Sequence, residues 1–201
     1  MRQKRVKQAT YETLSDGGVL IKPELLDFKE AHVYLEIGSG KGLFITSLAK
    51  DNPENRYVAL EININVCYRI LEKKEAQDLS NLTIILGDAS DLSSYFKAHS
   101  VDHIYLNFSD PWPKAKHHKR RLTYPTFLNM YEKILKKDGI IQFRTDHHGL
   151  FEDSLTYIKT HFDVFEITND LNESSYMTEY EMKKRSVGPI YQLKARIKDV
   201  T

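Results

Sequence analysis

Short apolar, β-rich runs alternate with longer helical patterns from residue 31 onward, and this alternation constrains the fold more than any other feature of the chain. Parallel strands need long connections, and helices supply them while covering both faces of the sheet. The predicted strands are 33–37, 56–61, 82–86, 101–108, 140–144, 164–168 and 190–197. No helix is predicted between the last two, which indicates an antiparallel terminal hairpin. The sequence therefore predicts an α/β fold with a seven-stranded, mostly parallel sheet and helices on both faces.

Helical patterns fill the intervals between these strands. The predicted helices are 42–50, 65–78 and 151–160, with a short helical turn at 88–96. A further helix is expected from Tyr124 to Leu135, because apolar residues recur there at helical spacing. Gly139 follows where a helix C-terminus favours glycine.

The length of 201 residues suits one globular domain with a sizeable core. Residues 31–201 are predicted to form that domain, whereas 1–30 are predicted to be a basic arm followed by a short packed segment. Cys67 is the only cysteine, which excludes an internal disulfide and any cysteine-rich metal site. No apolar run approaches the roughly 20 residues of a membrane span. We therefore expect a cytoplasmic protein without membrane contacts, either a monomer or a homodimer.

A glycine-rich turn follows the first predicted strand, and it reads E-I-G-S-G-K-G from Glu36 to Gly42. Glycines such as Gly38 and Gly40 let backbone amides approach a ligand closely, although a plain tight turn is the alternative. The spacing fits neither a phosphate-binding P-loop nor a dinucleotide fingerprint. The carboxylate of Glu36 instead suits a cofactor that carries an amine and a sulfonium cation.

The next two strands also end in carboxylates. Glu61 lies about twenty residues beyond the glycines, where a carboxylate can accept both hydroxyls of a ribose. Asp88 follows the third strand and can accept from the exocyclic amine of adenine. Taken singly, Glu61 could be an exposed acid at a helix start and Asp88 a helix N-cap. Taken together, the three strand ends outline the amino acid, ribose and adenine of one cofactor.

The fourth strand opens into the sequence S-D-P-W-P-K, from Ser109 to Lys114. The two prolines fix the chain direction, so that Trp112 becomes a rigid wall on which a planar base could stack. A strand-to-loop corner punctuated by prolines is the alternative. A basic block follows, and a second one at the N-terminus contains Arg2, Lys4, Arg5 and Lys7.

Clustered cations suggest a polyanionic partner, although a solvated charged face is the alternative. We expect the block after Asp110 to contact RNA phosphates, because it leaves the same strand end. Its members are Lys116, His117, His118, Lys119, Arg120 and Arg121. The paired histidines lack the spacing of a metal site, so no metal is expected.

With these motifs and the stretch T-E-Y-E at residues 178–181, the chain resembles the class I S-adenosylmethionine-dependent methyltransferases. Within them it looks like the tRNA guanine-7 methyltransferases. The resemblance implies a Rossmann-like fold, S-adenosylmethionine as cofactor, and tRNA as the partner methylated at nitrogen 7 of guanosine 46. It implies a methyl-donor site formed by Glu36, Glu61, Asp88 and Asp110, with Asp110 catalytic. It also implies that substrate is bound by Lys114, Asp146, Thr178, Glu179, Tyr180 and Glu181.

Nitrogen 7 of guanine carries a lone pair and no proton, so its methylation needs positioning and no general base. The transfer leaves positive charge on the base, which a nearby carboxylate such as Asp110 would stabilise. Two other functions remain open at this point. One is methylation of an amino group on another nucleic acid or a protein, and the other is a catalytically silent RNA-binding subunit.

Overall fold

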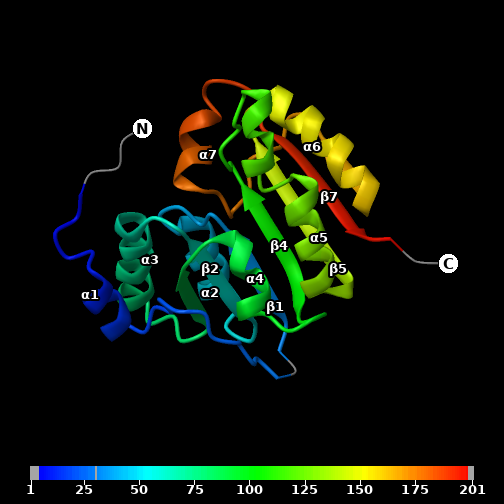
Figure 1. Cartoon of the computed structure of the whole chain (residues 1–201). Helices are drawn as coiled ribbons and strands as arrows, with labels where there is room; N and C mark the ends of the chain where they lie inside the picture. The colour runs from blue at the N-terminus through cyan, green and yellow to red at the C-terminus, as the bar shows by residue number, and fades with distance from the viewer. Residues whose placement is uncertain (1–4, 30, 199–201) are drawn as a thin grey trace.

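The computed structural model describes residues 5–29 and 31–198. Its centre is a seven-stranded sheet with the order β3-β2-β1-β4-β5-β7-β6 (Figure 1). The strands are β1 (Val33–Ile37), β2 (Arg56–Glu61), β3 (Leu82–Leu86), β4 (Val101–Asn107), β5 (Leu135–Thr145), β6 (Phe162–Thr168) and β7 (Tyr191–Ile197). Strands β1 to β5 pair in parallel, and β7 runs antiparallel to both β5 and β6. The predicted sheet and its antiparallel terminal strand pair are confirmed. The expectation that no helix separates the last two strands is wrong, because α7 (Glu179–Lys184) lies between β6 and β7.

Helices cover the sheet on two faces, and each face has its own apolar core. One core lies beneath α1 (Tyr11–Asp16), α2 (Leu43–Asp51) and α3 (Ile64–Ala76). The other lies beneath α4 (Leu92–Tyr95), α5 (Pro125–Ile134) and α6 (His148–His161). Two 3-10 turns and one short helix complete the structure: η1 (Ala89–Asp91), η2 (Ala115–Arg120) and α7 (Glu179–Lys184).

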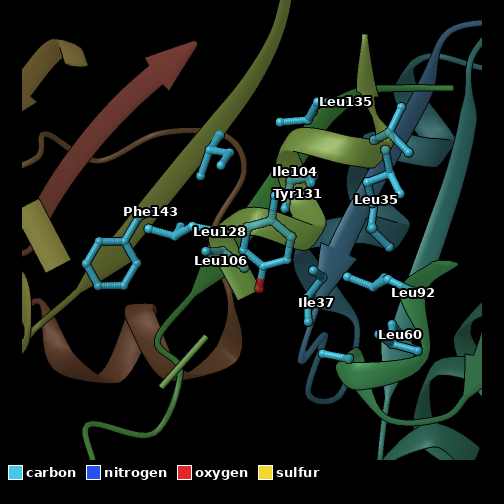
Figure 2. Close-up of a cluster of buried hydrophobic side chains, with 14 of the residues drawn as sticks. Leu35, Ile37, Leu60, Leu92, Ile104, Leu106, Leu128, Tyr131, Leu135 and Phe143 are labelled. Carbon is cyan, nitrogen blue, oxygen red and sulfur yellow. The ribbon is translucent and has the colours of Figure 1, made fainter. Parts of the chain in front are cut away.

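The larger core follows directly from the sequence pattern. In α5, Leu128, Tyr131 and Ile134 are buried at helical spacing and meet strand residues such as Leu35 and Leu106 (Figure 2). The central strands β1 and β4 are largely buried on both sides of the pleat because helices cover both faces of the sheet. This packing fixes the positions of the strand ends.

The segment after α5 differs from the prediction. Helix α5 ends at Ile134 and β5 begins at Leu135, so Gly139 lies inside a strand and does not cap a helix. The pairing with β4 shifts between Leu135 and Ile140, which leaves a bulge. A Cβ atom at Gly139 would lie 2.8 Å from the Lys136 carbonyl oxygen. Glycine is therefore required by close backbone packing within the bulge.

Helix α1, which the sequence pattern did not predict, begins after Thr10, whose hydroxyl accepts from the Thr13 amide. Beyond it, Val19 is buried and the Leu20 amide donates to the Ile84 carbonyl at the edge of the sheet. Arg5 is exposed, whereas the predicted basic residues Arg2 and Lys4 lie outside the described residues. The division of the chain at residue 30 stays a prediction. Within the described ranges, no helix is both long and apolar enough to cross a bilayer.

Candidate active site at the strand ends

A cavity of about 610 Å³ lies where β1, β2, β3 and β4 end. Its polar lining includes one predicted residue from each strand end: Gly38, Glu61, Asp88 and Asp110. Its apolar lining includes Leu60, Leu122 and Phe127. The carboxyl ends of adjacent parallel strands share one edge of a sheet, which is why residues distant in sequence converge here. A concave site with few polar groups on apolar walls suits a small organic ligand.

The glycine turn after β1 has a conformation that other residues rarely adopt. Gly38, Gly40 and Gly42 have φ angles of 74°, 56° and 82°, all in the left-handed region. The amide of Gly40 donates to Glu61 Oε2 at 2.9 Å. The turn thereby brings the ends of β1 and β2 together, as the predicted site requires.

Glu36 is fully buried beneath this turn, beside the cavity lining. Asn107 Nδ2 donates to its Oε1 at 2.8 Å, while Oε2 has no partner among the described residues. Burial raises the pKa of Glu36 to about 8, although the Asn107 bond opposes this effect. A buried acceptor without a partner is unfavourable, so the site suits a bound donor such as an ammonium group.

Glu61 is 8% exposed and accepts from two backbone amides, those of Gly40 and Asn63, each at 2.9 Å. Burial raises its pKa despite these bonds, and the negative charge of Asp110 adds to the increase. The charge of Asp110 therefore acts on Glu61 across the cavity. Each oxygen of Glu61 has a second lone pair, so the backbone bonds leave it able to accept from hydroxyls of a ligand.

Asp88 is both a helix N-cap and part of the cavity lining, so the two interpretations of this residue from the sequence do not exclude each other. Its Oδ1 accepts from the Ser90 amide at 2.8 Å and so caps η1. The same residue is exposed and lines the cavity beside Gly87 and Ala89. The N-cap role fixes where the carboxylate points, and it does not use both oxygens.

The chain after β4 turns sharply at what we call the Asp110 corner, residues 108–113. Phe108 and Trp112 have φ angles of 52° and 40°, which non-glycine residues adopt only under constraint. Asp110 is exposed, and both Asp110 and Trp112 line the cavity. The Arg120 guanidinium lies 4.9 Å from the centroid of the Trp112 ring, and the His117 ring packs edge-on against it. Lys114 is exposed at the start of η2 and does not line the cavity.

The basic block forms η2, and its members differ in exposure. Lys116, Lys119 and Arg120 are exposed, and the last two also line the cavity. His117 and His118 are half-buried. Arg121 is only 3% exposed and donates inward, including to Asp153 at 2.6 Å. Arg121 is therefore enclosed by its own protein, unlike Lys116, Lys119 and Arg120, and its expected contact with RNA stays a prediction.

Asp146 follows β5 and lies next to α7. Its Oδ2 accepts from the Tyr180 hydroxyl at 3.2 Å and pairs with Lys184 Nζ at 3.1 Å. The Tyr180 ring packs on Phe108, with ring centroids 5.2 Å apart. These contacts bring two predicted substrate residues, Asp146 and Tyr180, against the start of the Asp110 corner, outside the lining of the main cavity.

The other residues of the T-E-Y-E stretch hold α7 in place. Thr178 Oγ1 accepts from the Glu181 amide and caps the helix. Glu179 pairs with Lys73 at 2.9 Å, and Lys73 also donates to the Lys41 carbonyl oxygen in the glycine turn. Glu181 is fully buried between two arginines, Arg144 at 3.3 Å and Arg185 at 2.6 Å. Glu181 is thus enclosed by its own protein, and its expected contact with substrate stays a prediction.

Sequence reasoning missed several residues that organise the site, among them Asn107, Lys73 and Arg144. A signal for Asn107 was present, since it is the one polar residue in the otherwise apolar run from Ile104 to Phe108. Lys73 lies on the surface of a predicted helix, where charged residues are ordinary. Nothing in the sequence indicated that it reaches the glycine turn.

Comparison with known proteins gives consistent results. A family model described as "Putative methyltransferase" matches residues 30–193. The chain is 46% identical over 175 residues to the tRNA (guanine-N(7)-)-methyltransferase of Staphylococcus carnosus (strain TM300), covering 84% of this chain and 82% of that relative. It is 42% identical over 194 residues to the enzyme of the same name from Lacticaseibacillus casei (strain BL23), covering 90% and 91%.

Among solved structures, the fold is similar to that of a SAM-dependent methyltransferase from Aquifex aeolicus. The TM-score is 0.60 at 14% sequence identity, and the match covers 93% of this chain and 88% of that one. At this identity the likeness concerns the fold alone, and it agrees with the Rossmann-like class predicted from the sequence.

Proposed function

The chain belongs to the tRNA (guanine-N(7)-)-methyltransferase family, and from this premise we propose how its site works. The enzyme methylates nitrogen 7 of guanine in tRNA. We propose that the methyl donor is S-adenosylmethionine and that the target is guanosine 46 in the variable loop. The observation that carries the proposal is the single cavity lined by Gly38, Glu61, Asp88 and Asp110 at four neighbouring strand ends.

The residues present fit the proposed donor. The unpartnered Oε2 of Glu36 suits an ammonium group, and Glu61 can accept from ribose hydroxyls. Asp88 can accept from the adenine amine while Leu122 and Phe127 provide apolar walls. When bound, S-adenosylmethionine supplies an electrophilic methyl group on a sulfonium.

The protein's contribution to the reaction is positional and electrostatic. Nitrogen 7 attacks with its own lone pair, so no side chain needs to remove a proton. Positive charge develops on the guanine ring, and the exposed carboxylate of Asp110 lies at the cavity where it can stabilise that charge. Trp112 offers a flat apolar surface for the base, next to Asp110.

We propose that tRNA approaches along η2. Lys116, Lys119 and Arg120 are exposed there, and Lys119 and Arg120 reach the cavity itself. Cations of this kind position a phosphate backbone without reading its sequence. Tyr180 packs on Phe108 and donates to Asp146, outside the lining of the cavity. We propose that Asp146 and Tyr180 contact the base or its ribose.

The test is identification of the product. Unmodified tRNA transcript is incubated with the protein and methyl-labelled S-adenosylmethionine, digested to nucleosides, and analysed by mass spectrometry. We expect labelled 7-methylguanosine with the parent protein and far less with Asp110→Asn. Label in a different methylated nucleoside, or in none, would contradict the proposed function.

A further inference from the structure

Arg121 is the enclosed member of an otherwise accessible basic block. Its guanidinium N–H groups donate hydrogen bonds to the backbone of the Asp110 corner. Its Nε donates to the Pro111 carbonyl oxygen at 2.8 Å, and its Nη2 donates to the Trp112 carbonyl oxygen at 3.4 Å. Both carbonyls lie within the corner that carries Asp110 and the Trp112 ring to the cavity. The guanidinium therefore contacts the backbone that carries the proposed catalytic groups.

Among the described residues, Arg121 alone makes hydrogen bonds to the backbone of residues 109–113. Across residues 5–29 and 31–198, the main chain of 109–113 accepts hydrogen bonds only from Arg121 and donates none. Pro111 and Pro113 have no amide hydrogen to donate. The Phe108 amide donates to the Arg144 carbonyl oxygen at 2.9 Å, and beyond it the described backbone of the corner is hydrogen-bonded by Arg121 alone.

The corner also has a conformation that needs support. Phe108 and Trp112, which flank Asp110, both have left-handed φ angles. Such angles in bulky residues persist only where the surroundings enforce them. Bonds to the carbonyls of Pro111 and Trp112 restrict the peptide planes on both sides of Trp112, which is the region under strain.

Arg121 is itself held from outside the corner. Its Nη1 pairs with Asp153 Oδ2 of α6 at 2.6 Å, and its Nη2 lies 2.9 Å from His118 Nε2. The planar fork of arginine makes these bonds in fixed directions, which an ammonium group cannot reproduce. The side chain thereby connects the corner to a helix packed on the sheet.

We propose that Arg121 is a positioning residue for methyl transfer, which holds Asp110 and Trp112 in the orientation that the reaction requires. This inference rests on the proposed function of the site. It separates Arg121 from the neighbouring exposed cations, because a positioning residue acts on the chemical step and a phosphate contact acts on tRNA affinity.

The experiment compares Arg121→Lys, which keeps the charge and loses the fork, with the parent. Asp153→Asn is the second variant, because it weakens the anchor of Arg121 without removing the guanidinium. Lys136→Gln is the control, since it breaks another ion pair, with Asp102, at the opposite end of β4 and β5. Trp112 is the only tryptophan, so intrinsic fluorescence and its quenching by acrylamide report on the corner directly.

Three quantities are measured: the single-turnover methylation rate at saturating tRNA and S-adenosylmethionine, tRNA affinity over a salt series, and quenching of Trp112. For Arg121→Lys we expect the rate to fall by about 10- to 100-fold, the reduction typical of misplaced reacting groups. Quenching should increase, and tRNA affinity and its salt slope should match the parent. Asp153→Asn should change the rate and quenching in the same direction by a smaller factor, and Lys136→Gln should change neither.

The inference is overturned if both folded variants keep the parent rate within about threefold, a change of under about 1 kcal/mol in the barrier. A reduced tRNA affinity with an unchanged single-turnover rate would also overturn it and make Arg121 an RNA contact. If Arg121→Lys does not fold, Asp153→Asn decides the matter. Absence of 7-methylguanosine with the parent would instead reject the proposed function. The Trp112 quenching comparison would still test whether Arg121 restrains the Asp110 corner.

Discussion

At the scale of single residues, the carboxylates around the cavity differ chiefly in burial. Glu36 is enclosed with a pKa raised to about 8, Glu61 is nearly enclosed, and Asp88 and Asp110 are exposed. A buried carboxylate favours a specific cationic or hydrogen-bonding partner because water does not reach it. An exposed one remains available to a substrate that enters later. Burial thus separates Glu36 and Glu61 from Asp88 and Asp110, which a ligand can reach from solvent.

Replacing Glu61 by alanine should weaken binding of S-adenosylmethionine by at least about tenfold, since hydrogen bonds to a charged group contribute roughly 1.5–3 kcal/mol. The effect should include loosening of the glycine turn, because Gly40 donates to this carboxylate. Isothermal titration calorimetry measures the affinity. Glu75→Ala, at an exposed carboxylate on α3, is the matched control. An unchanged dissociation constant in folded Glu61→Ala would remove Glu61 from the site.

The Asp110→Asn variant should lose turnover far more than donor affinity, because the carboxylate charge matters most as the base becomes cationic. Single-turnover methylation of tRNA and calorimetric titration of S-adenosylmethionine provide the two values. Asp91→Asn, an exposed acid in η1, serves as control. A rate within about threefold of the parent, under about 1 kcal/mol of barrier, would show that the charge of Asp110 is dispensable.

Glu36 gives a pH prediction with a defined sign. Its pKa rises from 4.5 to about 8 in the folded protein, mainly through burial. Between these values the folded state keeps a proton that the unfolded state has released, so stability decreases as pH rises. In Glu36→Gln this contribution is absent.

Unfolding by urea of the protein without cofactor, from pH 5 to pH 8, measures the effect of Glu36. The free energy of unfolding of Glu36→Gln minus that of the parent should increase steadily with pH. Glu75→Gln, at an exposed carboxylate on α3, should give a nearly constant difference. A constant difference for Glu36→Gln as well would mean that Glu36 is ionised throughout this range.

At the scale of elements, the cavity is bordered by short segments at the carboxyl ends of the strands, namely the glycine turn, η2 and α7. Lys73 of α3 ties α7 to the glycine turn, and Tyr180 of α7 packs on Phe108 at the end of β4. Figure 1 shows α7 near the end of the β4 arrow. The 3-10 turn η2 presents its lysines outward while its following residue, Arg121, points inward. One basic run therefore has both exposed and enclosed members, which its sequence does not distinguish.

If η2 binds the phosphate backbone, removing its exposed lysines should change the salt dependence of tRNA binding. In Lys116→Ala/Lys119→Ala, affinity at low salt should fall. The slope of log affinity against log salt should flatten by about 0.7–0.9 for each phosphate that is no longer neutralised. Filter binding over a salt series provides the slopes. Lys137→Ala/Lys159→Ala removes two exposed lysines from β5 and α6 as a control. Equal slopes for all three proteins would mean that η2 is an ordinary solvated surface.

At the scale of the whole molecule, the sheet was predictable because buried strands leave a strong local pattern. The bounds of β1, β2 and β3 agree with the prediction, since glycine, proline or polar residues delimit each apolar run. The start of β5 was missed because Gly139 fits both a helix end and a bulge, and only packing against Leu135 and Lys136 decides between them.

The predicted acids and glycines at the strand ends do lie together, whereas the burial of Arg121 and Glu181 was not predicted. As with β5, the missing information is packing in the folded protein. Acids and glycines at strand ends were found because topology alone brings them to one edge. The inward orientation of Arg121 and Glu181 depends on partners 32 and 37 residues away, Asp153 and Arg144. Those contacts exist only after the chain has folded, so a run of charged residues gives no local sign of which members are enclosed.

The most direct test of the central claim replaces the nucleophile itself. A tRNA carrying 7-deazaguanosine at position 46 has carbon in place of nitrogen 7 and keeps the pairing edge of guanine. We predict that the parent protein binds this tRNA with an affinity close to that for the unmodified sequence and transfers no methyl group to it from S-adenosylmethionine. Methyl transfer to the 7-deaza tRNA at a rate comparable to the guanosine tRNA would contradict the account.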